Sequence, residues 1–120
     1  MSIAYSKEHI WVKEEDGVAL LGLSEYAVTK LKAIMFLDLP EEGDEVIADS
    51  KFGDVESKKT VSDMISPVTG VVTEINEEAL DDPDLISDDP KECWLVKVKI
   101  SHISDSLMDE DEYEEYTKTL

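Results

Sequence analysis

Two adjacent lysines, Lys58 and Lys59, stand between two stretches rich in β-forming residues, 51–57 and 60–65. Because a short polar break between such stretches is typical of a hairpin, we expect both lysines on a tip that projects into solvent. An exposed lysine held by a steady hairpin suits a covalent handle that must enter several active sites. Lysines on a turn also solubilise a chain and blunt sheet edges, so residue types alone leave both interpretations open.

The other reactive side chains give little support to an enzyme. The single cysteine, Cys93, adjoins Trp94 in an apolar run, where a free cysteine usually behaves as a small buried hydrophobe. A catalytic thiol needs an activating base, and neither His9 nor His102 is near Cys93 in the sequence. The sequence contains no phosphate-binding glycine loop, no cysteine and histidine cluster with metal-ligand spacing and no nucleophile motif. We therefore expect a protein that is not an enzyme.

The charge of the chain excludes two classes of partner. Eleven Lys and Arg residues oppose 30 Asp and Glu residues, which gives a formal net charge of −19 at pH 7. Such a protein repels phosphate backbones and anionic lipid, so we expect it to bind neither nucleic acid nor membrane. The same charge favours partners with basic docking surfaces, although acidity can also serve solubility alone.

The size of the chain and its first residues suggest its organisation and compartment. With 120 residues it is long enough for one packed core, so we expect a single domain over 1–120. The lone cysteine fits a reducing compartment. The N-terminus lacks a secretory signal, which favours the cytoplasm, or a mitochondrion if a transit peptide has been removed.

The sequence predicts that the elements around the lysines are mostly short strands separated by turn residues. Ser24 is a suitable N-cap for a helix over 25–32, and the acidic, proline-interrupted loop 81–90 can form a small plug or helical turn around Leu85 and Ile86. A thin apolar stripe predicts a helix beyond Ser104. The predicted strands are 9–13 and 18–23, joined as a hairpin, then 34–39, 45–48, 51–57, 60–65, 70–76 and 94–100. This pattern indicates a mainly β fold, a small antiparallel sandwich or barrel with short flanking helices and a C-terminal helix.

The segment 52–70 resembles the lipoyl-attachment segment of glycine cleavage H proteins. The family shows a Glu-Ser-Val-Lys-Ala core, then Ser-Asp and a Pro-x-x-Gly turn, which here match Glu56, Ser57, Lys59, Ser62, Asp63, Pro67 and Gly70. Lys58 replaces the usual Val and is the alternative to Lys59 as the carrier residue. Residues 5–12, 37–44 and 94–98 resemble further family signatures. Lys32 and Cys93 stand where the family commonly has glycine, and we expect the first to alter a helix cap.

The resemblance implies a fold of the lipoyl/biotinyl-carrier type and a non-enzymatic lipoyl carrier. A lipoyl group in amide linkage to Lys59 would take an aminomethyl group from a pyridoxal-phosphate glycine decarboxylase to a tetrahydrofolate-dependent aminomethyltransferase. Dihydrolipoyl dehydrogenase would reoxidise the arm, and a lipoyl ligase or transferase would attach it. We expect a monomer that meets these partners transiently. His9 and Trp11 are candidates for a cleft that shelters the arm, and Glu56 and Asp63 for recognition by the attaching enzyme.

Three other functions remain open from the sequence. The first is an H-like lipoyl relay that supplies lipoyl groups to other complexes or serves another modification system. The second is a biotin carrier, which fits less well because the attachment lysine of that family usually lies between two methionines. The third belongs to another class, an unmodified acidic binding module whose lysines are incidental. Lipoylation of Lys59 would separate this last function from the others.

Overall fold

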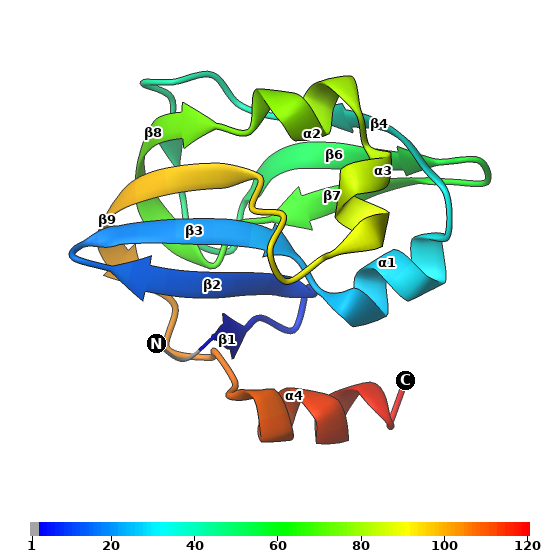
Figure 1. The fold of residues 1–120 in the computed structure, drawn as a ribbon. Coiled ribbons are helices and arrows are strands. Elements are labelled where there is room, and N and C mark those ends of the chain that lie inside the picture. The colour runs from blue at the N-terminus through cyan, green and yellow to red at the C-terminus, as the bar shows by residue number, and fades with distance from the viewer. Residues whose placement is uncertain (1–2) are drawn as a thin grey trace.

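The computed structural model describes residues 3–120, which form two antiparallel sheets packed face to face (Figure 1). The larger sheet has six strands in the order β1-β2-β3-β9-β8-β5, and the smaller has three in the order β4-β6-β7. The strands are β1 (Ala4–Tyr5), β2 (Ile10–Glu15), β3 (Val18–Leu23), β4 (Ile34–Asp38), β5 (Glu45–Val46), β6 (Lys51–Ser57), β7 (Val61–Ile65), β8 (Val68–Ile75) and β9 (Val96–Ile103). The helices are α1 (Glu25–Leu31), α2 (Glu77–Asp81), α3 (Asp84–Asp88) and α4 (Glu110–Thr117). The predicted mainly β sandwich with short helices is confirmed.

The first predicted hairpin forms as β2 and β3, which pair from Ile10 with Leu23 to Glu15 with Val18. Asp16 and Gly17 make its turn with φ angles of 53° and 81°. Positive φ at both central positions gives a turn whose twist matches that of antiparallel strands, which is why Gly17 suits this place. The hairpin anchors the larger sheet, because β1 pairs with β2 on one side and β9 with β3 on the other.

Helix α1 begins where the sequence predicts, since the backbone N–H of Ala27 donates to Oγ of Ser24 at 3.1 Å. It ends at Leu31, and the following residue, Lys32, has φ 63° and ψ −114°. Side chains other than glycine rarely adopt a positive φ, because Cβ then crowds the backbone. The sequence predicted an altered helix end because the usual glycine is missing. The structure shows this alteration, since Lys32 takes the glycine's place in a strained conformation.

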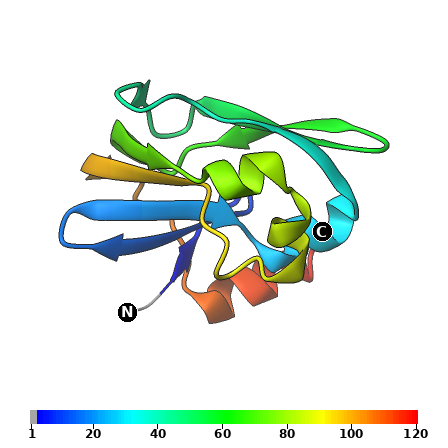
Figure 2. The ribbon, with the colours of Figure 1, turned by 45° about the horizontal axis from the view of Figure 1, so that its top comes forward.

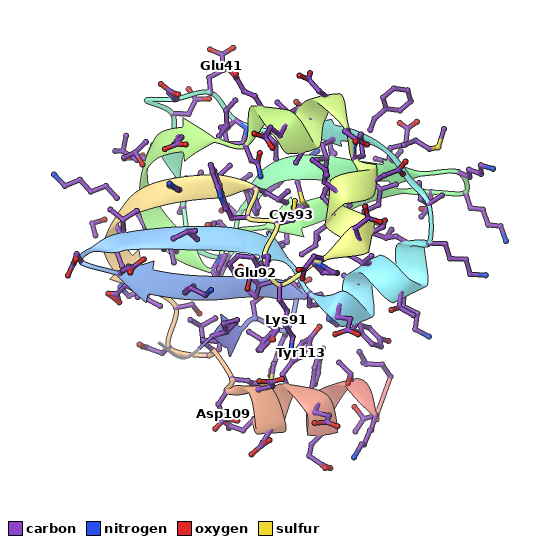
Figure 3. All side chains as sticks on the ribbon, in the orientation of Figure 1. Glu41, Lys91, Glu92, Cys93, Asp109 and Tyr113 are labelled. Atoms are coloured by element: carbon purple, nitrogen blue, oxygen red, sulfur yellow. The ribbon has the colours of Figure 1, made fainter. Side chains whose placement is uncertain are left out.

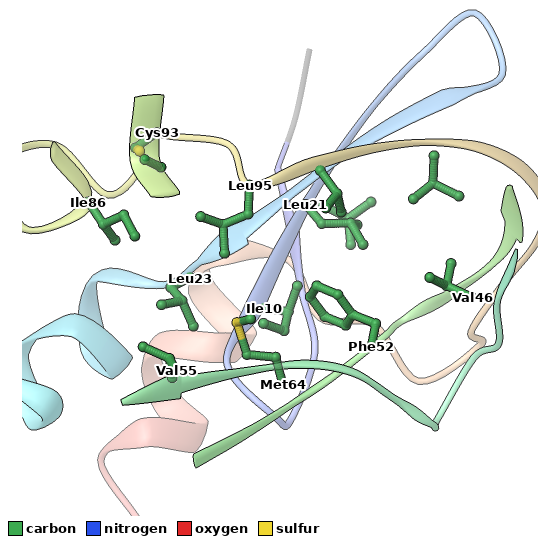
Figure 4. Close-up of a cluster of buried hydrophobic side chains, with 14 of the residues drawn as sticks. Ile10, Leu21, Leu23, Val46, Phe52, Val55, Met64, Ile86, Cys93 and Leu95 are labelled. Atoms are coloured by element: carbon green, nitrogen blue, oxygen red, sulfur yellow. The ribbon is translucent and has the colours of Figure 1, made fainter. Parts of the chain in front are cut away.

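The core lies between the two sheets and follows the alternation of the strands. Ile10 and Val12 of β2 belong to it, together with Leu21 of β3 and, from the smaller sheet, Val55 and Met64. Figure 4 shows Ile10, Leu21, Val55 and Met64 within this cluster. Each fully buried aliphatic side chain contributes about 1.5–3 kcal/mol of transfer free energy. This burial fixes the distance between the larger sheet and the β6–β7 hairpin.

Cys93 belongs to the same core, as the sequence predicts, with 9% of its surface exposed (Figure 3). Burial raises the pKa of its thiol, and the charges of Asp89 and Glu78 raise it further. The thiolate is the nucleophilic form, so these surroundings make Cys93 unreactive.

The segment between β8 and β9 differs from the sequence-based expectation. Helix α2 was not predicted, although Asn76 caps it by accepting from the backbone N–H of Ala79 at 3.3 Å. Helix α3 is the expected helical turn around Leu85 and Ile86. Helix α3 lies between the two others and contacts both α2 and α1 (Figure 2). The adjoining strands shift as well: β8 begins at Val68 and β9 at Val96, each two residues from the predicted start.

The C-terminal helix α4 begins at Glu110, later than Ser104, and a capping box of Asp109 and Glu112 starts it. The segment before it instead pairs with β1, because the backbones of Tyr5 and Met108 exchange two hydrogen bonds of 2.7 and 2.8 Å. The ring of Tyr113 stacks on that of Tyr5 with 4.5 Å between centroids. Over residues 3–120, no helix has the length and apolar character needed to cross a membrane.

Candidate functional site

Lys58 and Lys59 occupy the tip of the hairpin formed by β6 and β7, as the sequence predicts, and both are exposed. The hairpin extends beyond the rest of the sandwich (Figure 1). Ser57 closes the turn, since its backbone N–H donates to the carbonyl of Thr60 at 2.9 Å and its Oγ accepts from the N–H of Thr60 at 3.3 Å. Within residues 3–120, neither lysine has an ion pair with a carboxylate. Both amines are therefore available to an incoming enzyme.

The outer face of the three-stranded sheet continues from this tip. Phe36 of β4, Glu56 of β6 and Val61 of β7 lie in register across the sheet, with Phe36 63% and Val61 58% exposed. We call this surface the apolar row. Exposed apolar side chains mark a partner surface when they gather in a patch, which makes Phe36 and Val61 candidates for such a contact. Glu56, which the sequence nominates for recognition, stands in its middle.

The next row of the same face is acidic and consists of Asp38, Asp54 and Asp63. Lys51 lies over it, with Nζ 2.8 Å from Asp54 and 3.4 Å from Asp63. The hydrogen bond from Lys51 lowers the pKa of the Asp54 carboxyl, and these carboxylates raise the pKa of Lys51. Like charges side by side on neighbouring strands repel, and Lys51 relieves that repulsion.

A cleft of about 300 Å³ lies on the inner side of the hairpin. Its walls come from α1, from the turn before β2 and from the hairpin itself. It is lined by Glu8, His9, Ile10, Leu23, Tyr26, Ala27, Lys30, Leu31, Val55, Ser62, Asp63 and Met64. Most of these side chains are apolar, and Glu8 and Lys30 are charged. Asp63 borders the cleft, while its carboxylate lies near Lys51 on the outer face. Ser62 and Asp63 follow Lys59 by three and four residues, so the cleft is directly reachable from the tip.

His9 lies at the cleft, and its imidazole is half-buried. Its Nδ1 is 2.7 Å from the hydroxyl of Tyr113, and its ring is tilted against Tyr26 with 4.8 Å between centroids. Burial lowers the pKa of His9, and the neighbouring charge of Glu8 opposes that effect. The ring is therefore neutral at pH 7, because its ordinary pKa of 6.5 is already below this pH.

Trp11 does not line this cleft. His9 has φ 70° and lies before β2, so the alternation that would place residues 9 and 11 on one face begins only at Ile10. Ile10 enters the cleft, and Trp11 points to the opposite face of the sheet, where it packs over Gly22. Its indole Nε1 donates to the carbonyl of Pro90 at 2.8 Å. Trp11 is 1% exposed and has a structural role.

Several cleft residues were not nominated from the sequence. Tyr26, Lys30 and Leu31 come from α1, whose helical spacing was recognised without the face that it would present. Tyr113 reaches His9 from the other end of the chain, a contact that no local pattern predicts. Residues 3–120 contain no group of three or more His, Cys, Asp or Glu side chains that could hold a metal ion.

This architecture is that of a carrier domain of the lipoyl/biotinyl type: a small β sandwich that presents an exposed lysine on a projecting hairpin. The comparisons with known proteins narrow the class to a family. The model for the glycine cleavage H-protein matches residues 3–120, and the chain belongs to this family.

Relatives and a solved structure agree with this assignment. The chain is 46% identical over 118 residues to the glycine cleavage system H protein of Lachnoclostridium phytofermentans, covering 98% of this chain and 93% of the relative. It is 46% identical over 114 residues to the protein of the same name from Staphylococcus epidermidis, covering 92% and 90%. A crystal structure of a glycine cleavage system H protein from Mycobacterium marinum superposes with a TM-score of 0.92 at 35% identity, over 98% and 97% of the two chains.

Proposed function

We propose that this protein is the lipoyl carrier of a glycine cleavage system and that Lys59 is the residue that carries the lipoyl group. The observation that supports this most directly is an exposed lysine, free of ion pairs within residues 3–120, at the tip of the β6–β7 hairpin in a member of the H-protein family. The protein itself supplies position, reach and docking. It is not an enzyme, because the chemistry belongs to the attached group and to the partners' cofactors.

The residues around the hairpin fit a lipoyl group in amide linkage. Bound in this way, the group supplies a dithiolane that can accept and release an aminomethyl unit. Ser57 holds the attachment point steady through its two bonds to Thr60. Amide formation removes the positive charge of Lys59, so the resulting arm is compatible with the apolar floor of Ile10, Leu23 and Met64 in the adjoining cleft. A loaded arm that rests in this cleft is sheltered from water.

The partners follow from the same role. They are a glycine decarboxylase that loads the arm, an aminomethyltransferase that unloads it, a dihydrolipoyl dehydrogenase and a lipoyl ligase or transferase. The apolar row and the acidic row next to it suit docking sites with an apolar pocket rimmed by basic side chains. Glu56 and Asp63 lie on this face and are our candidates for recognition by the attaching enzyme. The bacterial relatives favour action in the cytoplasm.

Two other functions make different predictions. An H-like relay would also carry lipoate on Lys59 but would pass it to other complexes, so it would donate its group to a 2-oxo acid dehydrogenase. An unmodified acidic binding module would use the acidic face without any change at the lysines. The exposed tip, whose two amines have no ion pair within residues 3–120, favours a modified protein over this module.

The decisive experiment is mass spectrometry of the intact protein and its peptides after treatment with lipoate ligase, lipoate and ATP. We expect a single lipoyl increment on Lys59 that is lost in Lys59→Arg and kept in Lys58→Arg. The second variant is the matched control, because it changes the neighbouring residue of the same turn in the same way. No increment under conditions that modify an established H protein would reject the proposal in favour of the binding module.

A further inference from the structure

Tyr113 connects the C-terminal helix to two residues at the cleft. Its hydroxyl is 2.7 Å from Nδ1 of His9 and 2.7 Å from Oγ of Ser24. His9 lines the cleft, and Ser24 caps α1, which supplies another of its walls. One hydroxyl from the far end of the chain, visible where Tyr113 points from α4 into the sandwich (Figure 3), therefore joins two walls of the cleft.

These hydrogen bonds form a closed, buried network. The backbones of His9 and Ser24 are joined directly, because the N–H of Ser24 donates to the carbonyl of His9 at 3.0 Å. Tyr113 then bridges the side chains of the same two residues. Ser24 is 1% and Tyr113 6% exposed, so little water can replace these bonds. Buried hydrogen-bond networks of this kind hold their members in one arrangement.

The bonds also select a tautomer of His9. Oγ of Ser24 already accepts from the backbone N–H of Ala27 at 3.1 Å, which leaves its own hydrogen for Tyr113. Tyr113 then donates its hydrogen to Nδ1 of His9, and this arrangement gives both hydroxyl hydrogens a partner. In the neutral imidazole the proton then lies on Nε2, to which residues 3–120 give no hydrogen bond.

We propose that Tyr113 is a positioning residue for the cleft. Its hydroxyl fixes the orientation and the tautomer of His9, so that the ring offers Nε2–H as a free donor, and it holds the start of α1 beside it. This role rests on the proposed function only for the identity of the molecule that occupies the cleft. That occupant is an acyl arm linked to Lys59, and its amide carbonyl can accept a hydrogen bond from Nε2–H. Helix α4 thereby helps to shape a cleft that none of its own residues lines.

The first test uses the unmodified protein and does not depend on lipoylation. Nitrogen chemical shifts of ¹⁵N-labelled histidine at neutral pH report which ring nitrogen is protonated, and His102→Gln assigns the His9 signals. We expect His9 to be protonated on Nε2 in the wild type and to become a mixture of tautomers in Tyr113→Phe. A wild-type ring protonated on Nδ1, or an unchanged tautomer in Tyr113→Phe, would overturn the proposal.

Tyr116→Phe is the matched control, because it makes the same change one turn later in α4. The ring of Tyr116 is 6.2 Å from that of His9, but its hydroxyl bonds to the carbonyl of Lys7 at 3.4 Å. We expect its His9 signals to stay as in the wild type. Tyr113→Phe keeps the ring that stacks on Tyr5, so the fold is retained, and a thermal melt checks this. Ser24→Gly removes the other hydroxyl at little cost to the cap and gives a second variant.

The second test measures what the cleft does for the arm. In lipoylated protein loaded with an aminomethyl group, spontaneous hydrolysis breaks the carbon–sulfur bond and releases ammonia and formaldehyde, which is assayed directly. We expect release to be roughly fivefold faster in Tyr113→Phe, the scale set by one lost hydrogen bond, and unchanged in Tyr116→Phe. Equal rates in all three proteins would overturn the positioning role. Failure to lipoylate Lys59 would instead reject the proposed function, and the nitrogen shifts alone would then decide the role of Tyr113.

Discussion

Lys32 ends α1 in a conformation, φ 63° and ψ −114°, that suits glycine better than lysine. Such a conformation costs about 1–3 kcal/mol for a residue with a side chain. We therefore expect Lys32→Gly to raise the free energy of unfolding by about 1 kcal/mol, which urea denaturation would measure. Lys30→Gly, the same change two positions earlier and inside the helix, should lower it by a similar amount, because glycine is a poor helix former. Equal effects of the two changes would contradict the assigned strain.

Tyr113 makes the free energy of unfolding depend on pH in the alkaline range. Burial is the main cause that raises the pKa of its phenol from 10.0 to about 12 in the folded protein. As the pH rises, the phenol loses its proton in the unfolded chain before it does so in the folded protein. Its contribution to the free energy of unfolding is therefore fully present below pH 10 and is lost as the pH rises to about 12. We expect the free energy of unfolding to fall over this range by less in Tyr113→Phe than in the wild type. An equal fall in the wild type and in Tyr113→Phe would refute the assignment.

The types and spacing of residues predicted the exposed lysines of the hairpin tip but only part of their surroundings. The turn between two β-rich stretches is a local signal for Lys58 and Lys59 alike, and only the family resemblance favours Lys59 between them. The exclusion of Trp11 from the cleft could not be predicted from the sequence. It depends on the positive φ of His9, which shifts the start of the strand alternation by one residue. The bond from Tyr113 to His9 spans almost the entire chain and exists only in the folded protein.

At the scale of elements, α4 depends on its cap. Oδ1 of Asp109 accepts from the backbone N–H of Glu112 at 2.8 Å, and Glu112 accepts in return from the N–H of Asp109 at 3.2 Å. We expect Asp109→Ala to destabilise α4 by about 1 kcal/mol and to speed hydrogen exchange of its amides. Asp111→Ala removes a charge from the same turn without touching the cap and should leave exchange nearly unchanged. Equal exchange in both variants would argue against the capping box.

The strands were easier to predict from sequence than the short helices. Strands are recognisable from alternation and turn residues, so both hairpins and most bounds agree to within two residues. Helix α2 has only five residues, Glu77–Asp81, which is too short for a helical period to repeat. The delayed start of α4 has a tertiary cause, since Met108 pairs with Tyr5 in place of joining the helix.

At the scale of the whole molecule, the net charge of −19 predicts electrostatic steering of partners that have basic surfaces. We expect the association rate with aminomethyltransferase to fall roughly tenfold between about 0.05 and 0.5 M salt, while the dissociation rate changes little. Stopped-flow fluorescence would measure both rates. An association rate that is independent of salt would contradict electrostatic steering.

A pair of charge reversals would test whether partners dock on the outer face of the small sheet. Asp38→Lys changes the acidic row next to the hairpin, whereas Glu14→Lys makes the same change near the β2–β3 turn, at the opposite end of the sandwich (Figure 1). We expect the first to slow association several times more than the second. Equal slowing would mean that only the total charge matters and that the outer face of the small sheet has no special part.

The turn at Lys58 and Lys59 owes its shape to the folded sheet. It contains no glycine, has no positive φ among its residues, and is held by Ser57 on a β6 strand that is itself flanked by β4 and packed on the core. A two-stranded ribbon alone is marginally stable in water, so a peptide of residues 51–65 would seldom display this geometry. On the proposed function, we expect an attaching enzyme that recognises this turn to modify only folded copies. Misfolded copies would then remain without the lipoyl group, and the modification would report on folding.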